Sequence, residues 1–158
     1  MTAPSSPELG TTSDATVLIP GDPDAVRGFA THLGELATNL ETSGDNLKSV
    51  SLPSWHGEAA DAFEQAFSGV PGLWVDAAEI LNECKTALEQ HADAIVTAQA
   101  DAQQAIDAWE EGEQATAAAE QQYNQRLAVY NALPPTARMY QYPPYFNDRE
   151  GPGLRSEA

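Results

Sequence analysis

The stretch Leu52-Pro53-Ser54-Trp55-His56-Gly57-Glu58-Ala59-Ala60-Asp61-Ala62-Phe63 decides the fold, because one apolar helical pattern stops there and another begins. Pro53 disfavours helical backbone in the residue before it, and Gly57 can adopt the positive φ angle that a sharp turn needs. Glu58 and Asp61 then lie in the first turn of the next helix, where the helix dipole favours anions. We interpret the stretch as the turn of a helical hairpin, with Trp55 lying across its open end.

Apolar side chains recur every three or four residues before this turn, which predicts a first helix. The helix is expected to begin at Asp22-Pro23, an N-cap residue followed by proline at the first helical position. Its apolar stripe consists of Val26, Phe29, Ala30, Leu33, Leu36, Ala37, Leu40, Leu47 and Val50. After the turn, a short second helix should end near Ser68, because Pro71 between two glycines breaks or kinks a helix.

A very long helix is predicted from about Gly72 to Tyr130. Its stripe consists of Leu73, Trp74, Ala77, Ile80, Leu81, Cys84, Leu88, His91, Ile95, Ala98, Ala102, Ala105, Ile106 and Trp109, and it continues more weakly beyond them. On this stripe Cys84 is expected to be a buried small side chain, and His91 a core or interface histidine. Glu110-Glu111-Gly112-Glu113 is expected to be the weakest point of the helix.

The predicted helices differ greatly in length: at about 1.5 Å per residue the first is roughly 40 Å long, whereas the pattern from Ala59 to Tyr130 would exceed about 100 Å. Two arrangements remain open. Either Pro71 folds the chain back so that three helices pack together, or the half beyond Ala98 offers its stripe to something outside the chain. In both cases the expected fold class is all-α, an elongated helical hairpin or bundle.

The chain ends on both sides of this helical domain differ from it in composition. Residues 1–16 are rich in Ser, Thr, Pro and Gly and predict a flexible arm. Residues 17–132 form the helical hairpin or bundle domain, in which Val17-Leu18-Ile19 is expected to be an extended segment. Residues 133–158 contain a loop of prolines and aromatic residues and then, at Gly151-Pro152-Gly153, the start of a further helix. We therefore expect the natural protein to continue beyond Ala158.

Composition excludes several classes of partner. The formal net charge is -17, from 24 acidic and 7 basic residues, so nucleic acid and anionic membrane surfaces would be repelled. No apolar run is long enough for a membrane span, and the N-terminal residues lack the basic and hydrophobic parts of a secretory signal peptide.

No pattern of catalytic residues is found. His32, His56 and His91 belong to different segments, and none has the spacing of a metal ligand with Cys84 or with another histidine. Paired acids such as Glu79 with Glu83 and Asp107 with Glu111 lie four apart on helix faces expected to be solvated, so they lack a pocket for acid–base chemistry. We expect no cofactor, no metal and no enzymatic activity in this chain.

The turn and the segment before the first helix carry a family resemblance. Trp55-His56-Gly57 followed by Glu-Ala-Ala-Asp-Ala-Phe resembles the Trp-x-Gly turn of the WXG-like helical-hairpin proteins exported by type VII (ESX) secretion systems of actinobacteria and related bacteria. Ile19-Pro20-Gly21-Asp22-Pro23-Asp24-Ala25-Val26-Arg27 resembles the start of the first helix in the larger secretion-signal domains at the N-terminus of polymorphic toxins. The resemblance covers roughly residues 17–130.

The resemblance implies a targeting domain that acts by helix–helix recognition. Its partners would be a helical-hairpin protein or a second copy of the chain, together with the secretion machinery, and export would need no cleavable signal peptide. Alternatives are a stand-alone secreted partner or adaptor protein of the same superfamily, and a structural coiled coil unrelated to secretion.

The binding residues implied in this way are Trp55, Gly57, Phe63, Phe67, Trp74, Trp109 and Glu113. The family's Tyr-x-x-x-Asp/Glu export signal is not matched: no tyrosine has an acid four residues later, and the nearest pattern is Trp109 to Glu113.

Overall fold

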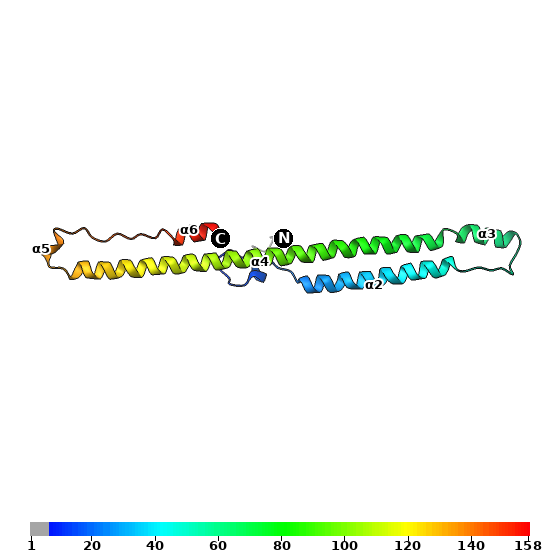
Figure 1. The fold of residues 1–158 in the computed structure, drawn as a ribbon, viewed down its shortest axis with the longest axis horizontal. Helices are drawn as coiled ribbons and strands as arrows, with labels where there is room; N and C mark the ends of the chain where they lie inside the picture. Colours follow the sequence, from blue (N-terminus) through cyan, green and yellow to red (C-terminus); the bar gives the residue numbers. More distant parts are fainter. Residues whose placement is uncertain (1–6) are drawn as a thin grey trace, which may run out of the picture. The chain divides into compact units, whose positions relative to one another are not determined.

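The computed structural model describes residues 7–158, and in this range the chain forms helices and no strand (Figure 1). The helices are α1 (Ala15–Leu18), α2 (Pro23–Lys48), α3 (Glu58–Phe67), α4 (Val70–Ala132), α5 (Pro135–Arg138) and α6 (Gly151–Glu157). The predicted all-α class and the very long helix are confirmed. The first six residues of the expected flexible arm lie outside the described residues, and the arm stays a prediction.

The chain divides into two compact units. The hairpin unit, Gly21–Val96, contains α2, α3 and the first part of α4. The tail unit combines the described part of Met1–Pro20 with Thr97–Ala158, and so contains α1, the later part of α4, α5 and α6. The hairpin unit contains five of the predicted binding residues, and the tail unit contains the other two, Trp109 and Glu113.

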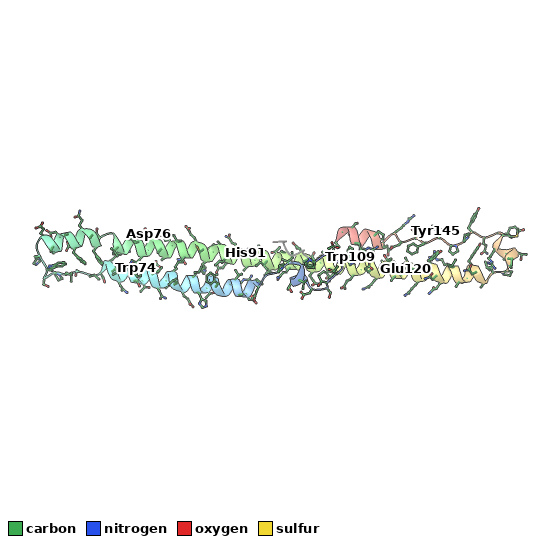
Figure 2. The ribbon with its side chains drawn as sticks, turned by 180° about the vertical axis from the view of Figure 1, so that it is seen from behind. Trp74, Asp76, His91, Trp109, Glu120 and Tyr145 are labelled. Atoms are coloured by element: carbon green, nitrogen blue, oxygen red, sulfur yellow. The ribbon has the colours of Figure 1, made fainter. Side chains whose placement is uncertain are left out.

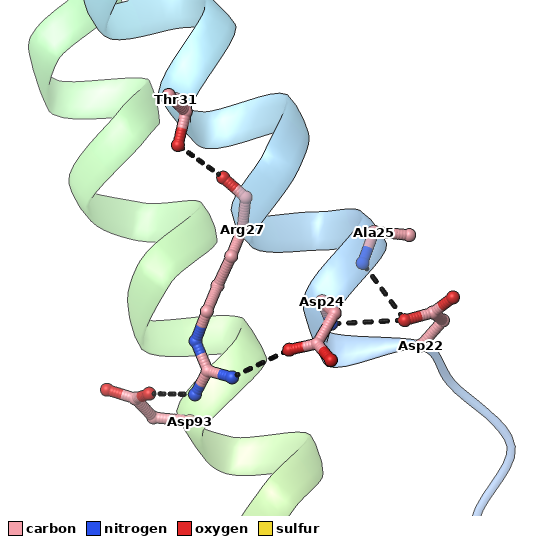
Figure 3. Close-up of polar contacts among 6 residues, drawn as sticks. All are labelled: Asp22, Asp24, Ala25, Arg27, Thr31 and Asp93. Atoms are coloured by element: carbon pink, nitrogen blue, oxygen red, sulfur yellow. Dashed lines mark hydrogen bonds and ion pairs between the residues drawn. The ribbon is translucent and has the colours of Figure 1, made fainter.

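Helix α2 begins where its sequence predicts. The carboxylate of Asp22 accepts hydrogen bonds from the backbone amides of Asp24 (3.0 Å) and Ala25 (2.9 Å), and Pro23 occupies the first helical position (Figure 3). One turn later, the guanidinium of Arg27 donates to Asp93 of α4 (2.8 Å) and lies 3.5 Å from Asp24. The hydrogen bond to Asp93 raises the pKa of Arg27, and this pair ties the start of α2 to α4.

Small residues form the contact between α2 and α4. Ala30 and Ala37 of α2 and Ala92 of α4 are fully buried, and Ala78 of α4 is nearly so. A Cβ atom built on Gly44 would lie 3.1 Å from the carbonyl oxygen of Pro71, so the backbones approach closely there. Ala30, Ala37 and Gly44 recur every seven residues, as expected for two helices packed at a shallow crossing angle.

Pro71 interrupts the helix without folding the chain back. Helix α3 ends at Phe67 and α4 begins at Val70, which confirms the predicted break. Pro71 lies in the first turn of α4, where the missing amide hydrogen has no helical acceptor to lose. Within the hairpin unit α3 leads into α4 and does not return beside it (Figure 1), so the arrangement of three packed helices is wrong.

The segment Val17-Leu18-Ile19, expected to be extended, belongs largely to a short helix, α1. Its N-cap is Asp14, whose carboxylate accepts from the hydroxyl (2.7 Å) and the backbone amide (2.8 Å) of Thr16. These bonds lower the pKa of Asp14 and favour a helical turn over a strand. Ala15 is buried, and the side-chain amide of Gln99 on α4 donates to the carbonyl of Ile19 (3.1 Å).

The end of the chain returns along α4 within the tail unit (Figure 1). After α5, residues 139–148 form no regular structure, and the short helix α6 follows. Phe146 meets Tyr123 edge to face, with ring centroids 5.9 Å apart. Segments of the same chain thus lie on the half beyond Ala98, and binding of something outside the chain to this half stays a prediction.

We predict that enlarging a buried alanine at the α2–α4 contact destabilises the hairpin unit. Ala92→Leu should lower the free energy of unfolding by about 1–3 kcal/mol, because the two backbones leave no space for the added methyl groups. The matched control is Ala94→Leu, two residues further along α4 at an exposed position. Urea unfolding followed by circular dichroism measures both; equal stabilities of the two variants would contradict close packing at Ala92.

Candidate functional site

Gly57 forms the predicted hairpin turn. Its backbone angles are φ 105° and ψ 178°, a region open essentially to glycine alone, and it is the N-cap of α3. Its carbonyl accepts from the amides of Ala60 (2.8 Å) and Asp61 (3.1 Å). A Cβ atom at this position would meet nothing within 4 Å, so the backbone conformation alone requires glycine.

Three aromatic side chains gather beside this turn. The rings of Trp55 and Phe63 are tilted with centroids 5.5 Å apart, and those of Phe63 and Phe67 are stacked at 5.2 Å. Trp55 is 42% exposed, so its indole is not largely buried across the end of the hairpin. The ring contacts Phe63 and also lines a groove that is open to solvent.

A shallow groove of about 200 Å³ runs beside these rings. Its lining residues are Val50, Ser51, Leu52, Trp55, Ala60, Phe63, Glu64, Phe67 and Ser68. Four predicted binding residues thus come together, since Gly57 holds the turn and Trp55, Phe63 and Phe67 form the aromatic cluster. Trp74 lies elsewhere, on the side of α4 that faces Gly44, whereas Asp76 points away from α2 (Figure 2).

The hairpin unit also exposes one apolar side, formed by Phe29 and Leu36 of α2 and by Leu73, Ile80 and Cys84 of α4. The exposed fractions are 57% for Phe29, 48% for Leu36, 67% for Leu73 and 60% for Ile80, and Cys84 is exposed. The predicted burial of Cys84 is therefore wrong, and His91, expected in a core or interface, is exposed in the described chain. All of these lie on the predicted stripes, but a single partner helix covers only part of each stripe.

Phe29, Leu36 and Cys84 lie on the same edge of the helix pair, and Leu73 and Ile80 lie beside Cys84 but further round α4, away from α2. At 3.6 residues per turn, a residue directly before a buried position lies on one edge of the contact, and one directly after lies on the other. Phe29 and Leu36 precede Ala30 and Ala37, and Cys84 precedes Lys85, which contacts α2 at Gly34. The ion pair of Arg27 with Asp93, the residue after Ala92, marks the opposite, polar edge.

In the tail unit, Trp109 and Glu113 contact segments of their own chain. A Cβ atom on Gly10 would lie 2.6 Å from the indole Nε1 of Trp109, so the N-terminal segment passes directly over that ring. Glu113 accepts from the guanidinium of Arg155 on α6 at 3.0 Å. Whether either residue binds a partner stays a prediction.

Helix α6 docks through two glycines. A Cβ atom on Gly112 would lie 2.9 Å from the carbonyl oxygen of Gly151, and both glycines are buried. Arg155 donates to the carbonyl of Gly112 (3.0 Å) and to the hydroxyl of Thr116 (2.9 Å). Gly112 lies within the stretch expected to be the weakest of α4, yet the helix continues through it. Helix α6 occupies the space that a side chain at this position would fill.

Two further properties of the described chain concern membranes and metal ions. No helix within residues 7–158 is long and apolar enough to cross a bilayer. The same range holds no group of three or more His, Cys, Asp or Glu side chains placed to bind a metal ion.

Comparison with known proteins identifies the family. Residues 2–158 match a family described as "Putative T7SS secretion signal domain", where T7SS denotes the type VII secretion system. The chain belongs to this family. Its role is thus in type VII secretion targeting, and the resemblance noted in the sequence is confirmed at that level. No curated protein and no solved structure matches the chain.

We predict opposite effects for two glycine substitutions in this secretion-signal domain. Gly57→Ala should destabilise the fold by about 1–3 kcal/mol, because alanine is strained at φ 105°. Gly28→Ala, inside α2 with nothing within 4 Å of the added methyl group, should stabilise it by about 0.5–1 kcal/mol. Thermal unfolding measures the stability of both variants. A Gly57→Ala variant as stable as wild type would show that the turn does not require glycine.

A further prediction concerns the docking of α6. Gly112→Ala should release this helix, because the new methyl group would overlap the side chain of Arg155 and the carbonyl of Gly151. Hydrogen exchange of the Leu154 and Arg155 amides should then rise about fivefold or more, the effect of losing roughly 1 kcal/mol of docking energy. The control is Gly72→Ala, which adds a methyl group to α4 in open space and should leave that exchange unchanged.

Proposed function

We propose that this chain is the targeting domain of a protein exported by the type VII route, and that it acts by binding a second helical hairpin through its exposed apolar side. The family assignment supports the role in secretion targeting. The apolar side of the hairpin unit is the observation that carries the mechanism, since it is where this unit leaves large apolar side chains uncovered on both of its long helices.

Burial explains why a partner is expected. Within the described residues no large side chain is fully buried, and the buried apolar positions are six alanines and Ile106. Leu33, Leu40, Leu81 and Leu88 are only half-buried. A second hairpin with a similar apolar side would complete their burial, at roughly 25 cal/mol for each Å² of apolar surface removed from water.

Charge restricts the partner further. With a net charge of -17, two copies of this chain repel one another, whereas a less acidic hairpin protein is repelled less and a basic one is attracted. We therefore favour a separate helical-hairpin protein over a homodimer. The polar edge with its Arg27–Asp93 pair then stays in solvent while the apolar side meets the partner.

In this proposal the chain is not itself an enzyme and carries no cofactor. It is the N-terminal part of a longer toxin, and any catalytic activity belongs to a domain that follows it. The protein resides in the cytoplasm before export and is secreted without a cleavable signal peptide. The Trp55–Phe63–Phe67 cluster, with the turn at Gly57, presents a second recognition surface to the secretion machinery.

The test compares two variants of α4, one with a new charge on the apolar side and one with a new charge on the polar edge. Ile80→Asp puts a carboxylate in the proposed contact, and Thr86→Asp puts one at an exposed position on the polar edge of the same helix. We expect Ile80→Asp to weaken binding to the co-produced hairpin partner at least about tenfold and to abolish export, since burying an unpaired charge is costly. Thr86→Asp should bind and export like wild type.

Titration calorimetry measures the binding, and immunoblotting of the culture medium measures the export. Circular dichroism of both variants checks that they remain folded, which their exposure leads us to expect. Wild-type binding and export of Ile80→Asp would refute the apolar side as the contact.

A further inference from the structure

The loop between α5 and α6 presents a row of tyrosines to solvent. We call residues 139–146, Met-Tyr-Gln-Tyr-Pro-Pro-Tyr-Phe, the tyrosine segment. Its exposed fractions are 88% for Tyr140, 96% for Tyr142 and 76% for Tyr145. Within residues 7–158 none of the three hydroxyls takes part in a hydrogen bond, and Figure 2 shows Tyr145 on the return stretch beside α4.

The backbone of the segment is equally unused. From Tyr142 to Asn147 no amide or carbonyl group forms a hydrogen bond within the described chain. Pro143 and Pro144 fix their own φ angles near -65° and keep the residue before each of them extended. A chain with free backbone groups and adjacent prolines is what domains that recognise polyproline II ligands bind.

The segment is nevertheless held at both of its ends. On one side Arg138 of α5 donates to the carbonyl of Leu133 at 3.0 Å. On the other, Phe146 packs against Tyr123, and Asp148 accepts from the hydroxyl of Thr116 and from the amide of Gly151. A ligand fixed at both ends has less conformational freedom to lose on binding, which favours affinity.

Charge sets this segment apart from the rest of the chain. Between Leu133 and Asn147 the only charged side chain is Arg138, in a chain whose net charge is -17. A partner that binds this segment therefore contacts its aromatic rings and its backbone, and acidic side chains take no part in the recognition. Tyrosine suits that role, because it combines a large apolar surface with a polar group and is enriched where binding energy concentrates.

We propose that the tyrosine segment is a docking ligand for a folded protein whose groove is lined by aromatic side chains and accepts an extended, proline-containing strand. The tyrosines at positions 142 and 145 occupy its pockets, and the two prolines between them keep the backbone extended. This site belongs to the tail unit and uses no residue of the apolar side, so it is separate from the hairpin contact proposed above.

The experiment uses the full chain in a host that exports it, with the photo-reactive amino acid p-benzoylphenylalanine replacing Tyr142. We expect cross-links to one folded protein, at residues that line a groove rich in Trp and Tyr. Replacing both Pro143 and Pro144 with alanine should lower the cross-link yield at least about tenfold. Cross-links only within the chain itself or to lipid, no cross-link at all, or a yield that the proline replacements leave unchanged would overturn the proposal.

Binding of the purified partner supplies the quantitative control. Tyr145→Ala should raise the Kd at least about tenfold, as expected when an anchoring aromatic ring is lost. Val129→Ala removes a 68% exposed apolar side chain from α4, outside the segment, and should leave the Kd unchanged. Ile80→Asp tests the hairpin unit. A variant that loses the hairpin contact but still binds the partner of the tyrosine segment would show that the two proposals are independent.

Discussion

The close approach of α2 and α4 through alanine and glycine is the constraint on which the hairpin unit depends. Ala30, Ala37, Gly44, Ala78 and Ala92 let the two backbones come together, but they bury little apolar surface per residue. The larger side chains of the same stripes, such as Phe29 and Ile80, are then left at the edge of the contact. A pair of helices joined in this way has a well-defined register and incomplete burial of its apolar side chains, and the proposal that a second hairpin binds to it rests on that combination.

Much of this arrangement could be predicted from the sequence because its causes are local. The N-cap at Asp22, the break before Pro71 and the glycine turn at Gly57 follow from the chemistry of one or two residues each. The apolar periodicity located the long helices as well. It could not say how much of each stripe would be covered, because burial depends on how many helices share a face. Cys84, predicted to be buried, is exposed for that reason.

The tail unit was harder to predict because its contacts join residues far apart in the chain. Periodicity marked Gly112 as a weakness, and nothing local indicates that Gly151 and Arg155 would use the space it leaves. The helical turn at α1 was missed although its signal was present, since Asp14 followed two residues later by Thr16 is a recognisable N-cap. Of the candidate site, the sequence indicates Trp55, Phe63 and Phe67 as binding residues and indicates a loop of prolines and aromatic residues near the end of the chain. The contacts among the three rings and the exposure of the helix-pair edge and of the tyrosines depend on tertiary packing and are known only from the structure.

The passage of the N-terminal segment over Trp109 has a consequence for the order in which the protein assembles. The contacts of the hairpin unit lie within Gly21–Val96, so that unit can fold as soon as this stretch has left the ribosome. Gly10 leaves the ribosome first, yet its neighbour on α4 is synthesised much later, and contacts between distant residues form slowly because they must close a long loop. The stretch around Gly10 is therefore expected to be among the last parts to reach its final place, after a stage in which the hairpin is complete and Gly10 has not yet reached the indole of Trp109.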